Sequence, residues 1–401
     1  MSKDTFIFLA VTGLILRITF SYLTPAFTGN DEQAHLRYVQ HILADKRLPN
    51  LNNYPTENPA GNEYFQPPLF YTLLAPLIAL AQDPIHQLRI GRLFSILLWL
   101  AAFYFTYKIL ALIRLSGWIS TSIIAFVALL PSYVVNSSVV TNDALVIPLF
   151  TITLYFILTL LNNSLTYSKL ALLALLAALT VLSKLNGLII VPIAYLLIFF
   201  HHKSFNSTLL LKALFFSSVL FTLTFWWFLF NFTTYSNLLG PIETSTATFT
   251  KIPFGLYKIF LIMRGSFATF WIAYGPANEI RLSTIVYLLL FFLTIFSLLG
   301  IWFYFKKLTM QKVNKLSEKP ILILFTALIT NLALLLVFNI WQHQPLGRYL
   351  FLSLIPISLI FSSGLYFILP QLFRKFVPLF LILLLLTLNI WGAVTLLKIY
   401  H

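Results

Sequence analysis

The feature that most constrains this chain is a series of long apolar runs separated by short polar connections. A helix needs about 20 mostly apolar residues to cross a bilayer, and about eleven runs meet or approach that length. They lie at about 5–24, 90–110, 118–136, 143–161, 169–183, 185–201, 209–231, 282–305, 320–341, 349–369 and 377–397. The fifth run is short, and the two runs beside Lys184 would also fit one re-entrant hairpin. The sequence therefore predicts an all-α polytopic membrane helix bundle, with a single domain over residues 1–401.

The composition excludes a soluble enzyme. Charged residues make up 9% of the chain and hydrophobic residues 59%, whereas a soluble domain carries roughly 25% charged residues. The chain has no cysteine, which excludes disulfides, thiolate metal sites and cysteine nucleophiles. In a membrane protein, a net charge of +15 is explained first by basic loops that mark the cytoplasmic side and by contacts with lipid headgroups. Because no RNA- or DNA-binding motif is present, we expect no nucleic-acid partner.

The distribution of charge predicts the orientation. The lysine-rich connection at 306–319 and the other short basic connections fall on one side of the predicted spans, which the positive-inside rule places in the cytoplasm. Nine of the 11 acidic residues fall on the other side, leaving only Asp4 and Glu318 inside. We therefore expect a multi-pass protein of the cytoplasmic membrane, with a cytoplasmic N-terminus and its active site outside. No signal-peptidase site follows the first run, which we expect to be retained.

Two long loops, at about 25–88 and 232–281, should lie on the outside. In the first loop, apolar residues at helical spacing predict a juxtamembrane helix from Asp31 to Asp45. Asn30 is the expected N-cap of this helix, and Gln33 stands at the capping-box position.

A second short helix should follow Pro67 and Pro68, which suit a helix start. Its apolar run, Leu69–Ala81, has only 13 residues and is too short to span. We expect it to be interfacial or re-entrant.

Asp31 and Glu32 are adjacent carboxylates just after the first span. They fit either a solvated helix start, favoured by the helix dipole, or a general base held at the membrane surface. His35 shares a helix face with Asp31, so these three side chains would also allow a divalent metal, although the spacing alone does not specify one.

Four cations, Arg89, Arg92, Lys184 and Arg348, should lie near the outer interface. Each alone would serve as a headgroup anchor, but together they indicate a site for an anionic lipid phosphate. Arg17, inside the first span, either reaches an interface or has a partner within the bundle, and its depth favours the second interpretation.

Taken in order, these stretches resemble the GT-C superfamily of polytopic glycosyltransferases, including bacterial aminoarabinose transferases and protein O-mannosyltransferases. The matching stretches are Asp31-Glu32 with His35, Leu36 and Tyr38; Gln66-Pro67-Pro68-Leu69-Phe70-Tyr71; Arg89 with Arg92-Leu93-Phe94-Ser95; Gly347-Arg348-Tyr349-Leu350 with Pro356; and, less closely, Ser183-Lys184. The aminoarabinose transferases carry a lysine directly before the proline pair, where this chain has Gln66, so that phosphate contact should move elsewhere or be lost. The chain also lacks the large soluble outer domain of some relatives, so we expect the loops or a partner to recognise the acceptor.

The resemblance implies that a sugar is transferred, with inversion, from a polyprenyl-phosphate donor to a hydroxyl of a glycan, lipid or protein outside the membrane. It implies catalytic roles for Asp31, as the general base, and Glu32. The substrate and the lipid phosphate would be bound by Arg89, Arg92, Lys184, Arg348, Tyr349, His35, Gln66 and Tyr71. On this interpretation, Asp31→Asn removes the base and changes donor affinity little.

Two other classes remain open. A lipid or glycan transporter or flippase would share the spans, but it should show matching halves or broken helices at the midplane, and the sequence shows no internal repeat. A non-catalytic envelope scaffold would tolerate replacement of Asp31.

Overall fold

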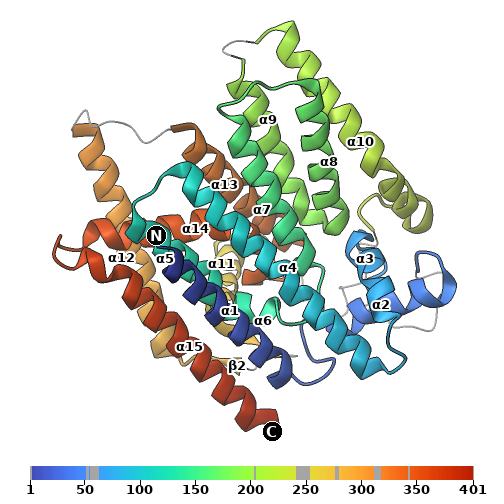
Figure 1. Ribbon diagram of the computed structural model, residues 1–401, viewed down its shortest axis with the longest axis horizontal. Coiled ribbons are helices and arrows are strands. Elements are labelled where there is room, and N and C mark those ends of the chain that lie inside the picture. Colours follow the sequence, from blue (N-terminus) through green and yellow to red (C-terminus); the bar gives the residue numbers. More distant parts are fainter. Residues whose placement is uncertain are drawn as a thin grey trace.

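The computed structural model describes residues 2–50, 54, 63–202, 205–240, 253–275, 280–310, 318–341 and 344–400, and this part of the chain is almost entirely helical (Figure 1). The longer helices are α1 (Lys3–Leu23), α4 (Pro84–Ile113), α7 (Asp143–Leu160), α10 (Ser207–Tyr235), α12 (Thr284–Met310), α13 (Glu318–Trp341), α14 (Leu354–Ile368) and α15 (Val377–Tyr400). The shorter ones are α2 (Glu32–Asp45), α3 (Leu69–Ile78), α5 (Gly117–Leu129), α6 (Pro131–Asn136), α8 (Tyr167–Ser183), α9 (Ile190–Phe200) and α11 (Leu256–Ile272). Three 3₁₀ turns, η2 (Leu185–Ile189), η3 (Gly347–Ser353) and η4 (Arg374–Phe376), lead into α9, α14 and α15.

The predicted all-α membrane bundle is confirmed. Eight helical segments of the described chain are long and apolar enough to cross a membrane. The three other predicted spans correspond to α5 with α6, α8, and η2 with α9, which are apolar helices of fewer than 18 residues. The α5 helix ends at Leu129 because Pro131 has no amide hydrogen to continue it, and the proline instead begins α6.

The short helices α8 and α9 form a hairpin with Lys184 at its apex. Lys184, which caps the C-terminus of α8, is paired with Asp143, the first residue of α7. Helix α7 therefore begins at the depth at which α8 ends. At the other end, His201 after α9 hydrogen-bonds the carbonyl oxygen of Asn163, between α7 and α8. The hairpin therefore reaches as far as α7, which itself is long enough to span.

The helices gather into two groups that share a core. Figure 1 shows α8, α9 and α10 (green) side by side, while α12, α14 and α15 lie at the opposite end of the view. Within these groups, α8 packs on α10 and α12 packs on α14. Helix α13 joins the groups, because it contacts both α9 and α14. Helix α5 contacts α1, α14 and α15 and is buried along almost its whole length.

The first long loop contains both predicted helices. Helices α2 and α3 pack on each other, and α3 also packs on α4. The 10 residues of α3 extend about 15 Å at 1.5 Å per residue, half of the roughly 30 Å hydrocarbon core. This length confirms that Leu69–Ile78 cannot cross the bilayer.

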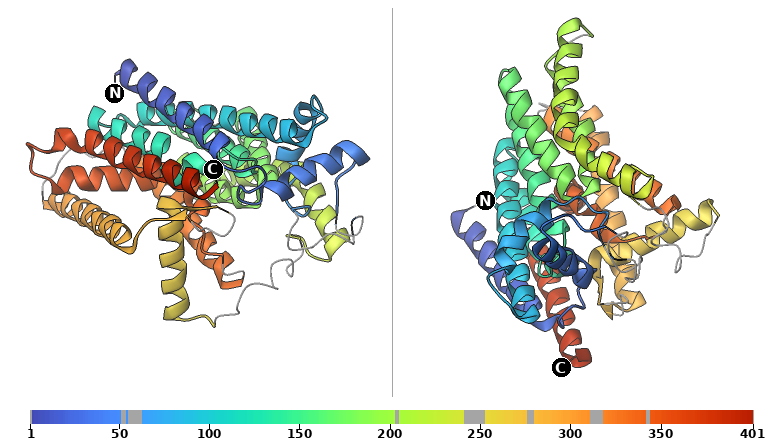
Figure 2. Two further views of the ribbon diagram at one scale, coloured as in Figure 1. Left: turned by 90° about the horizontal axis from the view of Figure 1, so that it is seen from below. Right: turned by 90° about the vertical axis from the view of Figure 1, so that its right-hand side faces the viewer.

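The second long loop contains an element that the sequence analysis missed. Helix α11 runs crosswise to α1 and α15, as the left view in Figure 2 shows. After α11, the chain forms the two-residue strands β1 (Ala273–Tyr274) and β2 (Ile280–Arg281), which pair antiparallel. Its ends are fixed to the bundle: Lys258 donates to the carbonyl oxygen of Ile340 at 2.7 Å, and the carbonyl of Phe270 accepts from the Ser132 hydroxyl.

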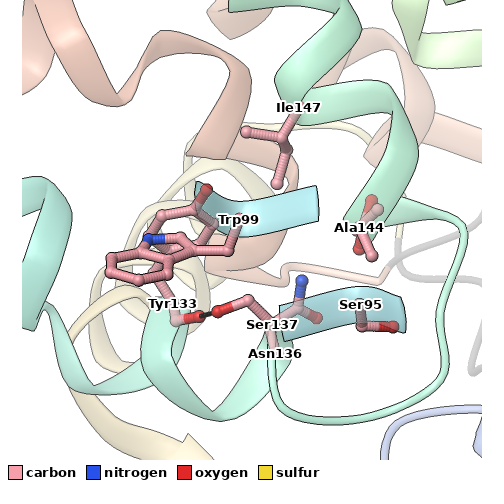
Figure 3. Close-up of a pocket in the computed structure, with 8 residues that line it drawn as sticks. Ser95, Trp99, Tyr133, Asn136, Ser137, Ala144 and Ile147 are labelled. Carbon is pink, nitrogen blue, oxygen red and sulfur yellow. Dashed lines mark hydrogen bonds between the residues drawn. The ribbon is translucent and has the colours of Figure 1, made fainter. Parts of the chain in front are cut away.

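Arg17 has the internal partners that its depth predicts. It is completely buried, donates to Ser137 Oγ at 2.8 Å and lies 3.6 Å from the ring centroid of Trp99. Figure 3 shows Trp99 and Ser137 on the wall of the small pocket beside it, with Ser137 bonded to the carbonyl oxygen of Tyr133. Among the described residues, hydroxyl, carbonyl and ring groups hold this guanidinium, and no carboxylate forms an ion pair with it.

Candidate active site

A cavity of about 2010 Å³ is lined by both long loops and by α11, α12 and α13. Its apolar side includes Phe260, Met263, Phe267, Phe291, Leu334 and Phe338. Its polar side includes Asp31, His35, Glu63, Gln66, Lys184 and Arg348. A cavity lined both by apolar side chains and by a cluster of charged groups suits an amphiphilic ligand with an anionic head.

Asp31 occupies the N-cap position of α2, one residue later than the predicted cap, Asn30. Its backbone is in the left-handed region (φ 57°), which aspartate tolerates better than most residues. The side chain makes no capping hydrogen bond and instead accepts one from Arg348, with 2.6 Å between Oδ2 and Nη2. The expected capping box is therefore wrong, and the carboxylate turns to the cavity.

The ion pair determines the charge of Asp31. Its side chain is 43% exposed, on the cavity side. Partial removal from water by itself raises the pKa of Asp31, but the positive charge and hydrogen bond of Arg348 outweigh this effect and lower the pKa to about 2. Asp31 is therefore ionised at neutral pH, and it is a weak base as long as the pair with Arg348 persists.

Arg348 is placed by the glycine before it. A Cβ on Gly347 would lie 2.2 Å from the backbone nitrogen of Phe270 on α11, so only glycine allows this approach. The Gly347 amide also donates to Thr269 Oγ1 at 2.6 Å. This anchor holds the η3 turn against α11 and directs Arg348 towards Asp31, 317 positions earlier in the chain.

Glu32 points away from the cavity. It is completely buried and forms a two-pronged ion pair with Arg92, at 2.9 Å from Nε and 2.6 Å from Nη2. Glu32 Oε1 also accepts from the amide of Val140 at 2.9 Å. Arg92 further donates to the carbonyl oxygens of Ser21, Thr24 and Pro25. The pair therefore ties α2 and α4 to the end of α1.

His35 and Tyr71 form a hydrogen-bonded pair beside Asp31. His35 Nδ1 lies 2.8 Å from the Tyr71 hydroxyl, and Tyr71 stacks on Tyr38 with ring centroids 3.8 Å apart. Burial lowers the pKa of His35 to about 3 and raises the pKa of Tyr71. A neutral imidazole therefore faces the cavity, with Tyr71 behind it.

Lys184 is held more deeply than Arg348. Its Nζ lies 2.6 Å from Asp143 Oδ1, and the side chains are 12% and 3% exposed. Tyr349 lies beside both cations, with its ring centroid 6.0 Å from Lys184 Nζ and 5.7 Å from the Arg348 guanidinium carbon.

Gln66 lies on the polar side of the cavity within a hydrogen-bonded chain. Its Oε1 accepts from Asn142 Nδ2 at 3.3 Å, and its side chain also bonds the carboxyl of Glu63. Directly after it, Pro67 and Pro68 lead into α3, as predicted.

Arg89 and Arg92 are not brought to the cavity. Arg89 is exposed on α4, and Arg92 is committed to Glu32. Of the four predicted phosphate-binding cations, Arg348 and Lys184 lie with Asp31. The turned-away Glu32 also breaks the suggested metal cluster, and the described residues hold no group of three or more His, Asp or Glu side chains placed to bind one metal ion.

The sequence analysis missed three charged residues that line the cavity: Glu63, Arg264 and Arg281. Glu63 stands three residues before Gln66, the first residue of the proline-proline motif recognised in the sequence. Its proximity to this motif was the available signal. Arg264 and Arg281 belong to α11 and β2, which the analysis treated as loop, so no pattern placed them near Asp31.

Comparison with known proteins identifies the fold. No protein-family model and no curated protein sequence matches the chain. Among solved structures, ArnT from Cupriavidus metallidurans in the apo state aligns over 98% of this chain and 76% of its own, with a TM-score of 0.56 and 12% identity. The same enzyme bound to undecaprenyl phosphate gives a TM-score of 0.53 at 14% identity, over 99% of this chain and 75% of its own.

An archaeal protein gives the same result. The oligosaccharyltransferase AglB from Archaeoglobus fulgidus, in complex with an inhibitory peptide and a dolichol-phosphate, aligns with a TM-score of 0.56 at 13% identity. The match covers 98% of this chain and 56% of AglB, so this chain spans just over half of that protein. The chain therefore shares its fold with ArnT and AglB, as the resemblance to the GT-C superfamily predicts.

Proposed function

We propose that this protein transfers a sugar from a polyprenyl-phosphate donor to an acceptor hydroxyl on the outer face of the cytoplasmic membrane, with inversion at the anomeric carbon. One observation carries the proposal: Asp31 and Arg348 form an ion pair at a cavity that is also lined by many apolar side chains. The fold supports it, since similar structures hold undecaprenyl phosphate or a dolichol-phosphate. The acceptor is a hydroxyl of a glycan, a lipid or a protein.

In the proposed reaction, Asp31 is the general base. The acceptor oxygen attacks the anomeric carbon from the side opposite the phosphate, and its proton passes to the Asp31 carboxylate. The bond between the anomeric carbon and the phosphate oxygen breaks, and its electron pair remains on the phosphate. Arg348 stabilises this developing charge, and a single displacement inverts the configuration.

Donor binding should separate the resting ion pair. Arg348 bonds Asp31 through Nη2, and its buried Nε has no partner among the described residues. A phosphate that bonds Nε and Nη2 together, as a two-pronged contact requires, therefore competes with the carboxylate for Nη2. Asp31 is 43% exposed and can turn into the cavity, whereas Asp143 is 3% exposed and should keep Lys184 in place. Loss of the Arg348 contact raises the pKa of Asp31, which makes it a stronger base once the donor is bound.

The test of this function is donor binding by an Arg348→Ala variant. Loss of a hydrogen bond to a charged group costs about 1.5–3 kcal/mol, so the Kd for undecaprenyl phosphate should rise roughly 10- to 150-fold. Titration of the purified protein in nanodiscs measures this change. Arg89→Ala is the matched control, since Arg89 is exposed on α4 outside the cavity. Equal Kd values for wild type and Arg348→Ala would contradict the proposed phosphate site.

The proposed orientation has its own test. Because the chain has no cysteine, single cysteines can be introduced at Lys46, after α2, and at Lys375, before α15. A membrane-impermeant maleimide added to intact cells should label the first and not the second. Labelling of Lys46→Cys only after the cytoplasmic side is opened would place the cavity on the wrong side for this function.

A further inference from the structure

Glu63 lines the cavity, but it takes part in none of the ion pairs described above and has no role in the proposed reaction. It lines the polar side with Asp31 and Lys184. Its Oε2 atom is buried and has no hydrogen-bond partner among the described residues. A buried carboxyl oxygen without a partner is costly, so its position on a ligand cavity indicates that a ligand supplies the missing contact.

The neighbours of Glu63 set its protonation. Burial and the negative charge of Asp31 raise the pKa of Glu63 to about 7, although Lys184, the Gln66 hydrogen bond and Arg348 act in the opposite direction. On the α3 side, Tyr71 is the other titratable neighbour. Near neutral pH, Asp31 is thus ionised while Glu63 is partly protonated, and such separated pKa values are typical of paired functional carboxyls.

We infer, on the basis of the proposed function, that Glu63 binds the donor by donating a hydrogen bond from its protonated carboxyl to an oxygen of the lipid-linked phosphate. The Gln66 side chain bonds the carboxyl and is itself bonded by Asn142, which fixes the direction of the Glu63 side chain. Gln66 stands where the aminoarabinose transferases carry a lysine, so a neutral acid here supplies one of the contacts that this lysine would otherwise provide.

Charge balance favours the protonated form in the bound state. The Asp31–Arg348 and Asp143–Lys184 ion pairs sum to zero net charge. The main charges that act on Glu63 are those of Asp31, Lys184 and Arg348, and not those of Arg264 and Arg281 on the same cavity. A bound phosphate makes the polar side negative, and the like charge raises the pKa of Glu63 further. Donor binding is therefore linked to protonation of Glu63, and it should weaken as the pH rises above the pKa of the free carboxyl.

The first experiment is the pH dependence of undecaprenyl phosphate binding by wild type and Glu63→Gln in nanodiscs. Between pH 7.5 and 9, the Kd of wild type should rise roughly five- to tenfold, since each unit of pKa difference is a tenfold change in an equilibrium constant. Glu63→Gln donates from an amide and cannot ionise, so its Kd should stay nearly constant. The phosphate itself does not contribute, because its second pKa is about 6. Asp83→Asn, at the exposed N-cap of α4, should behave as wild type.

The second experiment needs no variant. Calorimetric titration of wild type with undecaprenyl phosphate at pH 8, in buffers of different ionisation enthalpy, should show net proton uptake. The phosphate is already fully ionised at this pH. Loss of the Arg348 contact returns the pKa of Asp31 towards the ordinary aspartate value of about 3.9, which is still far below pH 8, so neither group accounts for the uptake. A Glu63 with only a structural role would change stability but would leave proton uptake at zero.

The outcomes separate the inference from the proposed function. If wild type binds undecaprenyl phosphate at no pH, the proposed function fails and the inference with it. If wild type binds the lipid with the same pH dependence as Glu63→Gln and takes up no proton, the inference about Glu63 is overturned and the function stands.

Discussion

Asp31→Asn is expected to lower sugar transfer by about 10²–10⁴-fold, the usual cost of losing a general base, while it strengthens the binding of undecaprenyl phosphate. The gain in affinity follows from the ion pair: without the carboxylate, Arg348 is free for the phosphate. Because the pair is partly exposed and therefore screened, we expect a gain of about three- to tenfold. The sequence alone predicts that the affinity changes little, whereas the ion pair between Asp31 and Arg348 leads us to expect this gain.

The measurement separates binding from chemistry. Kd comes from titration with undecaprenyl phosphate, and turnover comes from release of this lipid from a panel of polyprenyl-phosphate hexoses and pentoses incubated with envelope extract. Asp45→Asn, at the other end of α2, is the control and should change neither quantity. Undiminished turnover in Asp31→Asn, with binding intact, would rule out Asp31 as the base and would favour a transporter or a scaffold.

Glu32→Ala should produce the largest loss of stability. Removal of one partner of a buried ion pair costs about 3–5 kcal/mol, because the remaining charge stays buried without compensation. Here the loss would also leave the Val140 amide without its acceptor. Thermal unfolding followed by tryptophan fluorescence should show a clear decrease in Tm for Glu32→Ala and for Arg92→Met, and little change for Arg89→Met on the exposed side of α4.

The same variants decide whether Glu32 has a chemical role. Replacement of both charges by apolar groups of similar size is often tolerated, so Glu32→Leu combined with Arg92→Met should recover part of the lost stability. If the recovered protein transfers sugar, Glu32 is a structural residue. A Glu32→Gln protein with wild-type stability and no transfer would instead support the catalytic role inferred from the resemblance.

The sequence predicted the fold well because membrane spans obey a local rule. A run of apolar residues of sufficient length forms a helix whatever its neighbours are, since backbone groups in lipid must bond within the segment. The same rule correctly identified α3 as too short. It failed at α11, whose apolar residues are interrupted by Lys258 and by Arg264 to Ser266 and so form no long apolar run. It also failed at the two-residue strands β1 and β2.

The candidate site was harder to predict because its geometry depends on distant residues. Asp31 and Glu32 are neighbours in the sequence, yet one pairs with Arg348 and the other with Arg92. Their separation depends on the left-handed backbone of Asp31, which sends consecutive side chains in different directions. The environment of Glu63 likewise comes from Asp31, Lys184 and Arg348, which only the folded chain brings close to it.

The most direct test of the central claim is a cryo-electron microscopy map of the wild-type protein in nanodiscs with undecaprenyl phosphate. We expect density for the phosphate within hydrogen-bonding distance of Arg348, the lipid chain along Phe260 and Phe291, and the Asp31 carboxylate turned away from the guanidinium. A phosphate bound outside this cavity, or bound while the 2.6 Å pair between Asp31 and Arg348 remains closed, would contradict the account.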